Sequence, residues 1–563
     1  MVRPSKNCYF QCANLRKQSR KILYLLLNYI IHRMKNMINH LFGKLSLFLI
    51  CILSYNGIVS GKELPLIPNP NSVVVKNDST FKLAQGMSIG VLDPNLEPSA
   101  KALQAMIKKR TGLELPVQAN DTASILLIVD PALRGKEHYQ LEIGANGIEF
   151  RGSDPEAVFR GVTTLDQVLM EASARDAALD IQAVMIDDAP RYPYRALMLD
   201  PARNFLPVED VKSFIDHMAR YKYNVLQMHL SDDQGWRVQI DSYPELNSEK
   251  AYSKDDIKDI ISYAAERYIN VVPEIDIPGH TSAFLSVFPD LGCDNHKNEE
   301  IIVGKTDNRM LCASNPEVYN VFEGVLKEIS DLFPYDYIHL GGDEAAIPRN
   351  WALCESCLAY MAENGYSEPS QLMIPFFDKM LGFVRANGKK PILWCELNNI
   401  YPPADDYLFP YPDDVTLVTW RAGLTPTCLA LTEESGHPLI MAPGEYAYLD
   451  YPQMKGDLPE FNNWGMPVTT LSKTYQFDPG YGSAPEKEKH VMGVMGTLWG
   501  EAIKDINRVN YMAFPRALAL SEAGWTNMDN RDWESFKERL YPNLTELMKD
   551  GVSFRVPFEI ANQ

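Results

Sequence analysis

The most distinctive chemical feature of the sequence is the hexapeptide His339-Leu340-Gly341-Gly342-Asp343-Glu344, which ends in two adjacent carboxylic acids. Its two glycines permit a tight turn of the backbone directly after a strand. Neighbouring carboxylates perturb each other's pKa, so one can stay protonated while the other stays ionised. Cleavage of a glycosidic bond uses such a pair. The same residues would also suit a strand end followed by the acidic N-terminus of a helix, where carboxylates interact favourably with the helix dipole.

Further polar and aromatic residues follow other short apolar runs of the sequence. They are Asp200, Arg203, His229, Asp232, Asp233, Glu274, Asp276, His280, Trp394, Glu396, Trp420, Tyr448, Asp450, Trp499 and Glu501. Carboxylates and arginine can hydrogen-bond hydroxyl groups, and aromatic faces can stack on the apolar face of a pyranose. This inventory favours a sugar ligand. The sequence has no complete phosphate-binding loop, nucleophile elbow or HExxH helix.

These residues fall within a regular alternation of apolar runs and amphipathic stretches that begins after Pro193. The predicted strands are Ala196–Leu199, Val225–His229, Val271–Ile275, Tyr337–Leu340, Ile392–Cys395, Thr416–Trp420, Leu439–Ala442 and Val494–Trp499. Helices are predicted at Val208–Arg220, Lys254–Glu266, Glu317–Leu332 and Ser370–Ala386. Eight strands that alternate with helices predict an α/β fold of the (β/α)8 TIM-barrel type. The polar residues would then lie at the C-terminal ends of the strands, where barrel enzymes have their active sites.

The predicted barrel is flanked by other segments. Short β-rich runs and a helical stretch at residues 99–110 predict a small α+β domain over residues 62–188. Two prolines in the segment 187–193 then break the pattern, which places the barrel at 189–530. Residues 531–563 are predicted to form a C-terminal helical tail.

The composition indicates a large globular protein and excludes some classes of partner. The chain has 563 residues, of which 46% are hydrophobic, and a formal net charge of -19. Residues 1–61 hold nine Lys or Arg and no Asp or Glu, which leaves 45 basic against 73 acidic residues elsewhere. A nucleic-acid partner is not expected, because the body of the chain has no surplus of positive charge to meet phosphates.

The basic leader, residues 1–61, resembles a secretory signal. Its apolar runs, Ile22–Ile31 and Leu45–Leu53, are shorter than the roughly 20 residues of a membrane-spanning helix. The second run lies between lysines and small residues, which predicts a signal peptide cleaved near Lys62. We therefore expect an exported protein, periplasmic or secreted, without a membrane span in its mature form. Translation from Met34 or Met37 would give a signal of ordinary length. Ile50 before Cys51 argues against a lipid anchor.

Six cysteines lie beyond the leader. They are Cys293, Cys312, Cys354, Cys357, Cys395 and Cys428. The first two could form a disulfide in an oxidising compartment or remain two buried thiols. Cys354 and Cys357 form a single CxxC, and a second CxxC or a histidine pair is lacking nearby, so a local disulfide or packed thiols are favoured over zinc. The sequence predicts no metal and no cofactor.

Six motifs, in their order along the chain, resemble those of glycoside hydrolase family 20, the β-N-acetylhexosaminidases. Besides 339–344 they are 195–200 (RALMLD), 229–237 (HLSDDQGWR), 273–280 (PEIDIPGH), 448–450 (YLD) and 498–501 (LWGE). The similarity covers about residues 62–530 and includes the small domain before the barrel. The resemblance implies an exo-acting enzyme that removes terminal β-linked GlcNAc or GalNAc from glycans. It implies a retaining mechanism in which the substrate's acetamido carbonyl attacks the anomeric carbon to give an oxazolinium ion.

The resemblance also implies roles for individual residues. Glu344 would be the general acid and base, and Asp343 would orient the acetamido group and stabilise its charge. The Tyr448 hydroxyl would hold the acetamido oxygen, while Asp232 and His280 would form a relay behind Glu344. Residues implied to bind the sugar are Arg195, Asp450 and Glu501 through its hydroxyls, and Trp394, Trp420 and Trp499 as the walls of the pocket.

Two functions from other classes remain open from the residues. A glycan-binding protein could keep the pocket without chemistry, although it would not need the acid–base residues. A metallohydrolase could use His and carboxylate side chains at barrel strand ends as ligands of Zn²⁺ or Mn²⁺. Its ligands would be drawn from His229, Asp232, His280, His339 and Asp343.

Overall fold

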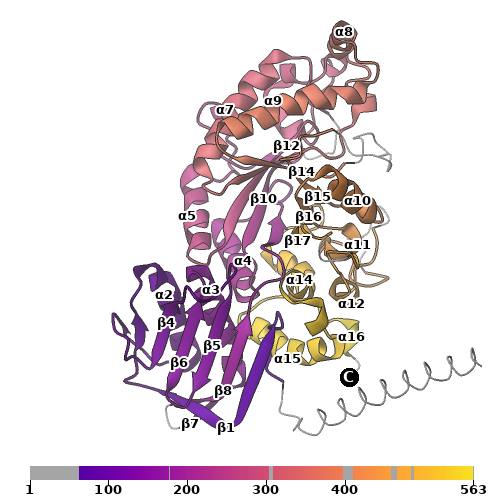
Figure 1. Ribbon diagram of the computed structural model, residues 1–563. Helices are drawn as coiled ribbons and strands as arrows, with labels where there is room; N and C mark the ends of the chain where they lie inside the picture. The colour runs from indigo at the N-terminus through magenta and orange to yellow at the C-terminus, as the bar shows by residue number, and fades with distance from the viewer. Residues whose placement is uncertain are drawn as a thin grey trace, which may run out of the picture. The chain divides into compact units, whose positions relative to one another are not determined.

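The computed structural model describes residues 63–563 apart from 176–177, 304–308, 397–409, 458–465, 484–486 and 562–563. The described residues belong to one compact unit (Figure 1). The leader predicted at residues 1–61 lies outside them, as do Met34 and Met37. Within the described ranges, no helix is both long enough and apolar enough to cross a membrane.

The first part of this unit is a small domain with a mixed sheet, in the order β1-β8-β5-β6-β4-β2-β3 and with β7 paired to β8. Its strands are β1 (Ser72–Ala84), β2 (Ile89–Val91), β3 (Val117–Gln118), β4 (Ile125–Val129), β5 (Tyr139–Gly144), β6 (Gly147–Gly152), β7 (Ser173–Arg175) and β8 (Ala178–Asp188). Helices α2 (Glu97–Thr111) and α3 (Pro155–Val168) complete it. The prediction of a small α+β domain is confirmed.

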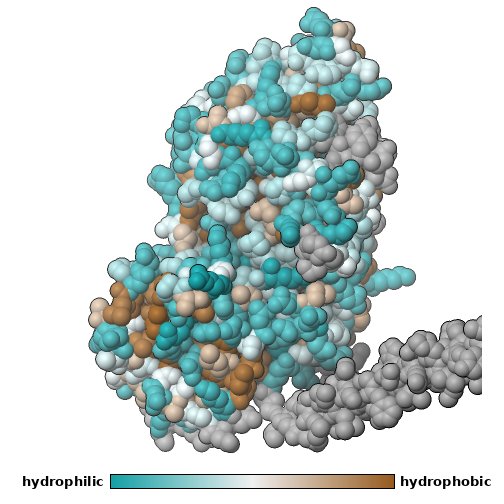
Figure 2. Space-filling model, in the orientation of Figure 1, coloured by the Kyte–Doolittle hydropathy of each residue, from teal (hydrophilic) through white to brown (hydrophobic). Residues whose placement is uncertain are grey.

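Burial within this sheet follows the two-residue period of its strands. In β6, buried residues alternate with partly exposed ones, and α3 packs on this sheet (Figure 1). Helix α3 begins at Pro155, and the Asp154 side chain accepts a hydrogen bond from the Ala157 amide. Apolar and polar side chains are mixed on the visible face of the domain (Figure 2). The sheet therefore buries one face against its helices and leaves the edge strand β1 partly exposed.

The second part is a closed parallel barrel. Its strands are β9 (Tyr194–Leu199), β10 (Val225–Asp232), β12 (Asn270–Ile277), β13 (Tyr337–Gly341), β14 (Lys390–Trp394), β15 (Thr416–Thr419), β16 (Leu439–Met441) and β17 (Val491–Leu498). Each strand pairs in parallel with the next, and β17 pairs with β9. The short strand β11 (Gly235–Trp236) extends β10 as a hairpin. The predicted (β/α)8 barrel is confirmed.

Helices lie between the barrel strands and beyond the last of them (Figure 1). They are α4 (Val208–Arg220), α5 (Lys254–Ala265), α6 (Ser282–Val287), α7 (Pro316–Leu332), α8 (Glu355–Asn364), α9 (Met373–Ala386), α10 (Thr425–Ser435), α11 (Gly444–Ala447), α12 (Leu471–Tyr475), α13 (Ile506–Ala513), α14 (Arg516–Trp525), α15 (Trp533–Lys549) and α16 (Phe558–Ala561). Strand β10 is buried along its whole length, because helices cover its outside and side chains fill the barrel inside. This rigid frame fixes the loops that follow the strands.

Candidate active site

The turn after β13 sets the positions of the two carboxylates. Gly341 has φ of 66° and Gly342 has φ of 95°, and a Cβ added to Gly341 would lie 1.7 Å from Asp276 Oδ1. Only glycine fits there. Glu344 itself has φ of 47°, a strained value for a side chain with a Cβ. The turn leaves the Asp343 side chain 10% exposed and the Glu344 side chain 43% exposed.

His280, from the loop after β12, faces both carboxylates. Its Nε2 lies 3.9 Å from Asp343 Oδ2 and 3.8 Å from Glu344 Oε2, while Nδ1 lies 3.3 Å from Asp232 Oδ1. Burial opposes a charged imidazole, but Asp232 and the other nearby carboxylates outweigh it and raise the pKa of His280 well above its usual value. A cation therefore sits between Asp232 on one side and the Asp343–Glu344 pair on the other.

Asp343 is a buried acid with a raised pKa and one carboxylate oxygen that lacks a partner among the described residues. Burial raises its pKa to about 6, Glu344 adds to the rise, and His280 opposes it. Its Oδ1 has no hydrogen-bond partner among the described residues. Asp276 lies behind it, accepts a hydrogen bond of 3.3 Å from the Gly342 amide, and has a pKa raised by burial and by the charge of Asp343. A buried oxygen that lacks a partner is the expected state of a group that awaits a ligand.

Asp232 is the most heavily paired carboxylate of the site. Its Oδ2 lies 2.9 Å from His229 Nε2 and 2.9 Å from the Arg203 guanidinium. Burial disfavours its charge, but Arg203 and His280 hold the pKa of Asp232 well below its usual range. It is therefore a permanent anion that supports His280.

An aromatic group lines the same end of the barrel. The ring centroids of Trp394 and Trp499 are 5.7 Å apart, and those of Tyr448 and Trp499 are 6.3 Å apart. Trp394 is 1% exposed and donates its indole hydrogen to Glu274 at 2.8 Å, whereas Trp420 and Trp499 are partly exposed. Trp394 thus forms the base of the group.

Two further acids stand beside these rings. Asp450 is 7% exposed, and its Oδ1 has no hydrogen-bond partner among the described residues. The Glu501 side chain is 35% exposed and lies 3.5 Å from Arg203. Burial raises the pKa of both acids. Both carboxylates are available to hydroxyl groups of a ligand.

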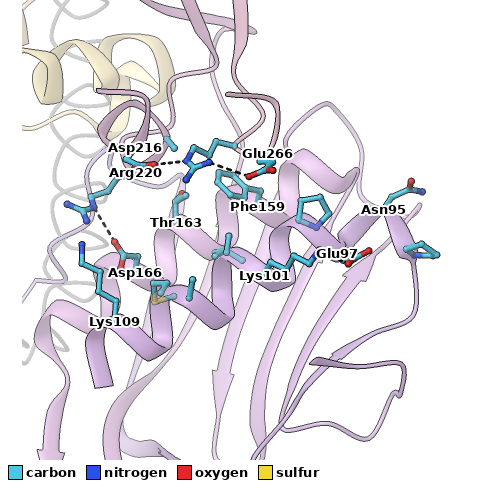
Figure 3. Close-up of a pocket in the computed structure, with 18 residues that line it drawn as sticks. Asn95, Glu97, Lys101, Lys109, Phe159, Thr163, Asp166, Asp216, Arg220 and Glu266 are labelled. Atoms are coloured by element: carbon cyan, nitrogen blue, oxygen red, sulfur yellow. Dashed lines mark hydrogen bonds and ion pairs between the residues drawn. The ribbon is translucent and has the colours of Figure 1, made fainter. Parts of the chain in front are cut away.

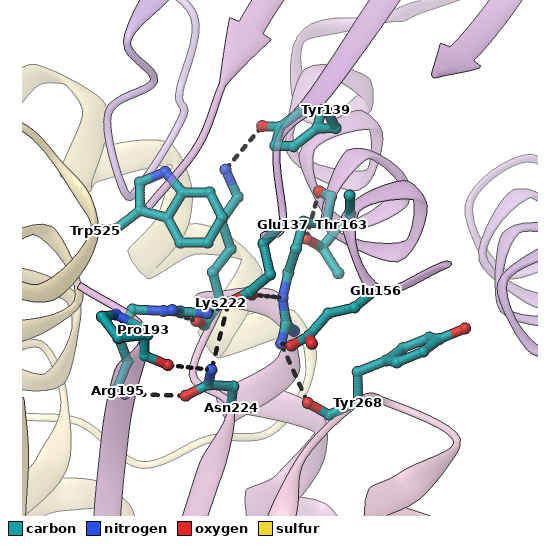
Figure 4. A network of polar contacts seen from close by, with 12 residues as sticks. Glu137, Tyr139, Glu156, Thr163, Pro193, Arg195, Lys222, Asn224, Tyr268 and Trp525 are labelled. Carbon is teal, nitrogen blue, oxygen red and sulfur yellow. Dashed lines mark hydrogen bonds and ion pairs between the residues drawn. The ribbon is translucent and has the colours of Figure 1, made fainter. Parts of the chain in front are cut away.

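The implied role of Arg195 in sugar binding is corrected, because the structure does not place this residue in the site. It precedes the apolar run of β9, so it lies at the opposite end of that strand. Its guanidinium binds Glu137 at 2.5 Å, near Lys222 and Trp525 (Figure 4). It also donates to the backbone oxygens of Lys222 and Tyr192 at 2.8 and 2.9 Å and stacks over Trp525. Arg195 therefore joins the barrel to the small domain and is closed to a sugar.

The cation at the catalytic end of β9 is Arg203, for which the motifs implied no role. Its position after the strand was the available signal. Glu396 also follows a strand and had no role implied for it. It pairs with Arg421 at 3.1 Å, and burial raises its pKa to about 7.

A cavity of about 810 Å³ lies away from these residues, between α2 and α3 of the small domain and α4 and α5 of the barrel. Several of its charged side chains pair with one another: Arg220 with Asp166 at 3.2 Å (Figure 3), and Arg267 with Asp216 at 2.6 Å. Its lining includes none of the predicted site residues.

The ligand set of the metallohydrolase hypothesis is only partly brought together. Among the described residues, groups such as Asp276, His280 and Asp343 have possible ligand atoms within 4.8 Å of one another, but His339 is in none of these groups. Asp232 already pairs with a guanidinium. None of these groups holds all five residues of the hypothesis.

Comparison with known families decides the membership of the chain. "Glycosyl hydrolase family 20, catalytic domain" matches residues 192–528, and "Glycosyl hydrolase family 20, domain 2" matches residues 63–189. The chain belongs to glycosyl hydrolase family 20. The resemblance seen in its motifs is confirmed, and the chain is a glycoside hydrolase.

Individual members of family 20 match over most of their length. A beta-hexosaminidase of Akkermansia muciniphila is 34% identical over 469 residues, which are 80% of this chain and 92% of that protein. One of Emericella nidulans is 31% identical and covers 82% of this chain and 81% of its own. The structure of Streptomyces plicatus N-acetyl-beta-hexosaminidase in complex with Thio-NAglucal matches with a TM-score of 0.76 and 30% identity, over 88% of this chain and 97% of that one.

Proposed function

We propose that the chain is an exported exo-β-N-acetylhexosaminidase that removes terminal β-linked GlcNAc or GalNAc from glycans. The named activities of its relatives support the class of sugar, and the signal-like leader supports export to the periplasm or the exterior. The observation that carries the proposal is the unequal pair Asp343 and Glu344. One carboxylate is buried with an unpartnered oxygen, the other is half exposed, and His280 faces both.

The proposed mechanism is retaining and substrate-assisted. The acetamido carbonyl oxygen attacks the anomeric carbon, the glycosidic bond breaks, and Glu344 gives its proton to the leaving oxygen. Asp343 accepts the acetamido N–H and stabilises the positive charge of the oxazolinium ion, and Tyr448 donates to the acetamido oxygen. A water molecule, deprotonated by Glu344, then attacks the anomeric carbon and opens the oxazolinium ring. The exposure of Glu344 supports its role, because it must reach first the aglycone and then water.

The remaining residues support binding and protonation in this scheme. His280 and Asp232 form a relay behind Glu344 that tunes its protonation. Arg203 takes the place that the sequence analysis gave to Arg195, because it stands at the catalytic end of β9 beside Glu501. Hydroxyl groups are bound by Arg203, Asp450 and Glu501, and the sugar pocket is lined by Trp394, Trp420 and Trp499.

The activity is tested with the purified mature protein and aryl N-acetyl-β-hexosaminides of the gluco and galacto series, from about pH 4 to 8. We expect release of the aryl group and, by NMR, the β-anomer as the first product. Absence of turnover on both series and on sulfated sugars would contradict the proposal. An α-anomer as the first product would reject the retaining mechanism alone.

The roles of the two carboxylates are separated by a thiazoline that mimics the cyclised acetamido group. We expect the wild type to bind it tightly and Asp343→Asn to bind it weakly. Glu344→Gln is the matched variant, and it should keep activity on substrates whose leaving groups need little protonation. Equal thiazoline affinity of wild type and Asp343→Asn would mean that Asp343 does not contact the acetamido group.

A further inference from the structure

Four buried cysteines meet near the catalytic end of the barrel. Cys293 and Cys312 lie between β12 and α7, Cys354 precedes α8, and Cys357 is in its first turn. Each is at most 3% exposed, and their four Sγ atoms lie within 4.8 Å of one another. The sequence suggested two separate pairs, because 42 residues separate Cys312 from Cys354. The fold brings the two pairs together, so the second cysteine pair that a CxxC zinc site needs is present.

The distances from Cys312 Sγ to two of the other sulfurs match those in a tetrahedral metal site. Cys312 Sγ lies 3.8 Å from Cys354 Sγ and 3.6 Å from Cys357 Sγ. Zinc binds thiolates at about 2.3 Å, so the edge of its ligand tetrahedron is about 3.8 Å long. A disulfide instead joins one sulfur to one partner at about 2.05 Å. Here Cys312 has two almost equidistant partners, which a single ion accommodates and a single disulfide does not.

The neighbours of the sulfurs suit thiolates. Ser314 Oγ lies 3.3 Å from Cys312 Sγ and 3.6 Å from Cys357 Sγ, within reach to donate its hydrogen. The backbone N–H of Cys357 is directed at Cys354. Such donors around the ligands orient them and spread their negative charge.

We propose that Cys293, Cys312, Cys354 and Cys357 hold one structural zinc ion. The four thiols would each lose a proton to solvent on binding, and four protein ligands leave no open position for catalysis. The site is independent of the proposed sugar chemistry and adds a metal that the sequence did not predict.

The zinc ion would fasten together two loops that carry the chemistry. Cys293 and Cys312 are in the segment that starts with His280 after β12, and the other two cysteines follow Asp343 and Glu344 after β13. Hydrogen bonds join the same segments, since Trp351 Nε1 donates to Leu311 O at 2.9 Å and Asp294 accepts from the amides at the start of α8. The ion would therefore help to keep His280 opposite the carboxylate pair.

The test is metal analysis of the full chain, purified without chelator or reductant. We expect one zinc per chain, and X-ray absorption with four sulfur neighbours at about 2.3 Å. Cys354→Ser/Cys357→Ser should lose the zinc, whereas Cys428→Ala should keep it, because Cys428 pairs with Cys395 outside this cluster. A chelator should lower the Tm of the wild type and leave that of the double variant unchanged.

Two results would overturn the proposal. Zinc-free protein whose four cysteines are alkylated only after reduction would show two disulfides instead. Zinc-free protein whose cysteines are alkylated on unfolding without reduction would show four thiols. Both results are read on the wild type, so they remain decisive if the double variant fails to fold.

Discussion

Two arginines stand at opposite ends of β9, Arg195 buried and Arg203 10% exposed, and each pairs with a buried carboxylate. Arg195, at the start of the strand, binds Glu137 and two backbone oxygens. Arg203, beyond its end, binds Asp200 and Asp232 and approaches Glu501. Burial and ion pairing are thus common to both ends.

The balance of charge separates the two ends. Glu137 lies between Arg195 and Arg160, and these two cations lower its pKa to about 2 despite burial. At the other end carboxylates outnumber the cations, several pKa values are raised, and oxygens of Asp343 and Asp450 lack partners among the described residues. Cations and carboxylates are thus closely balanced around Glu137, whereas carboxylates are in excess at the catalytic end, as is common at functional sites.

The largest expected effect is that of Asp343→Asn on activity. It should lower kcat by about 10²–10³ above pH 6, where the wild-type Asp343 carboxyl is ionised, because it removes an electrostatic interaction that grows in the transition state, as with the loss of one oxyanion-hole donor. The Tm of the variant above pH 6 should equal or exceed that of the wild type. The pKa of Asp343 is raised to about 6 in the folded protein, so its ionised form destabilises the fold above that pH, and the neutral Asn does not. Steady-state kinetics and calorimetry measure both. A variant as active as wild type above pH 6 would mean that the charge of Asp343 does not stabilise the transition state.

The reverse pattern is expected at the other end of β9. Arg195→Met should lower the free energy of unfolding by about 3–5 kcal/mol, because it removes one of the two cations that offset the buried charge of Glu137 and the donor to the backbone oxygens of Lys222 and Tyr192. The kcat/KM of the folded fraction should not change. Denaturant titration and kinetics of the same sample measure the two, and Arg203→Met is the control that should lose activity. A selective loss of activity in Arg195→Met would return Arg195 to the binding site.

A smaller effect concerns the position of the acid limb of the pH profile. Activity should fall below about pH 6 as Asp343 becomes protonated. The positive charge of His280 lowers that pKa, so His280→Asn should move the limb of kcat/KM to higher pH. A limb that stays in place or moves to lower pH would assign it to another group.

The smallest effect is expected at the cavity of Figure 3. Lys101 there pairs with Glu97, but the two side chains are 70% and 61% exposed, and exposed pairs contribute little. Lys101→Ala should leave both Tm and kcat/KM unchanged in the assays above. A drop in activity would connect this cavity to the chemistry.

Much of the barrel could be predicted from the sequence because its strands are apolar runs separated by amphipathic helices. The helix predicted at Val208–Arg220 has these bounds in the structure. Strand β10 was predicted to end at His229 but continues to Asp232, because its polar end is buried and pairs with β11. Periodicity identifies a strand by its apolar residues, so it misses a strand end whose side chains are polar.

The errors in the site have a different origin. Arg195 and Arg203 both border the first barrel strand, and only strand direction shows which one reaches the catalytic end. The motif resemblance implied Arg195, although a residue at the start of the apolar run lies at the N-terminal end of the strand, opposite the catalytic end. The four-cysteine cluster needed contacts between two loops, which spacing along the chain does not reveal.

The pairing of β9 with β17 has a consequence for how the chain folds during synthesis. β9 is the first barrel strand to be made, yet the partner that closes its second edge, β17, emerges only near the end of translation. The sheet of the small domain ends in the sequence at Asp188, although its core also takes in Trp525 of α14. We expect this sheet to form before the barrel closes, while the second edge of β9 stays unpaired and prone to aggregation until β17 is made. Protease resistance of residues 63–188 in nascent chains stalled before β17 would report this order.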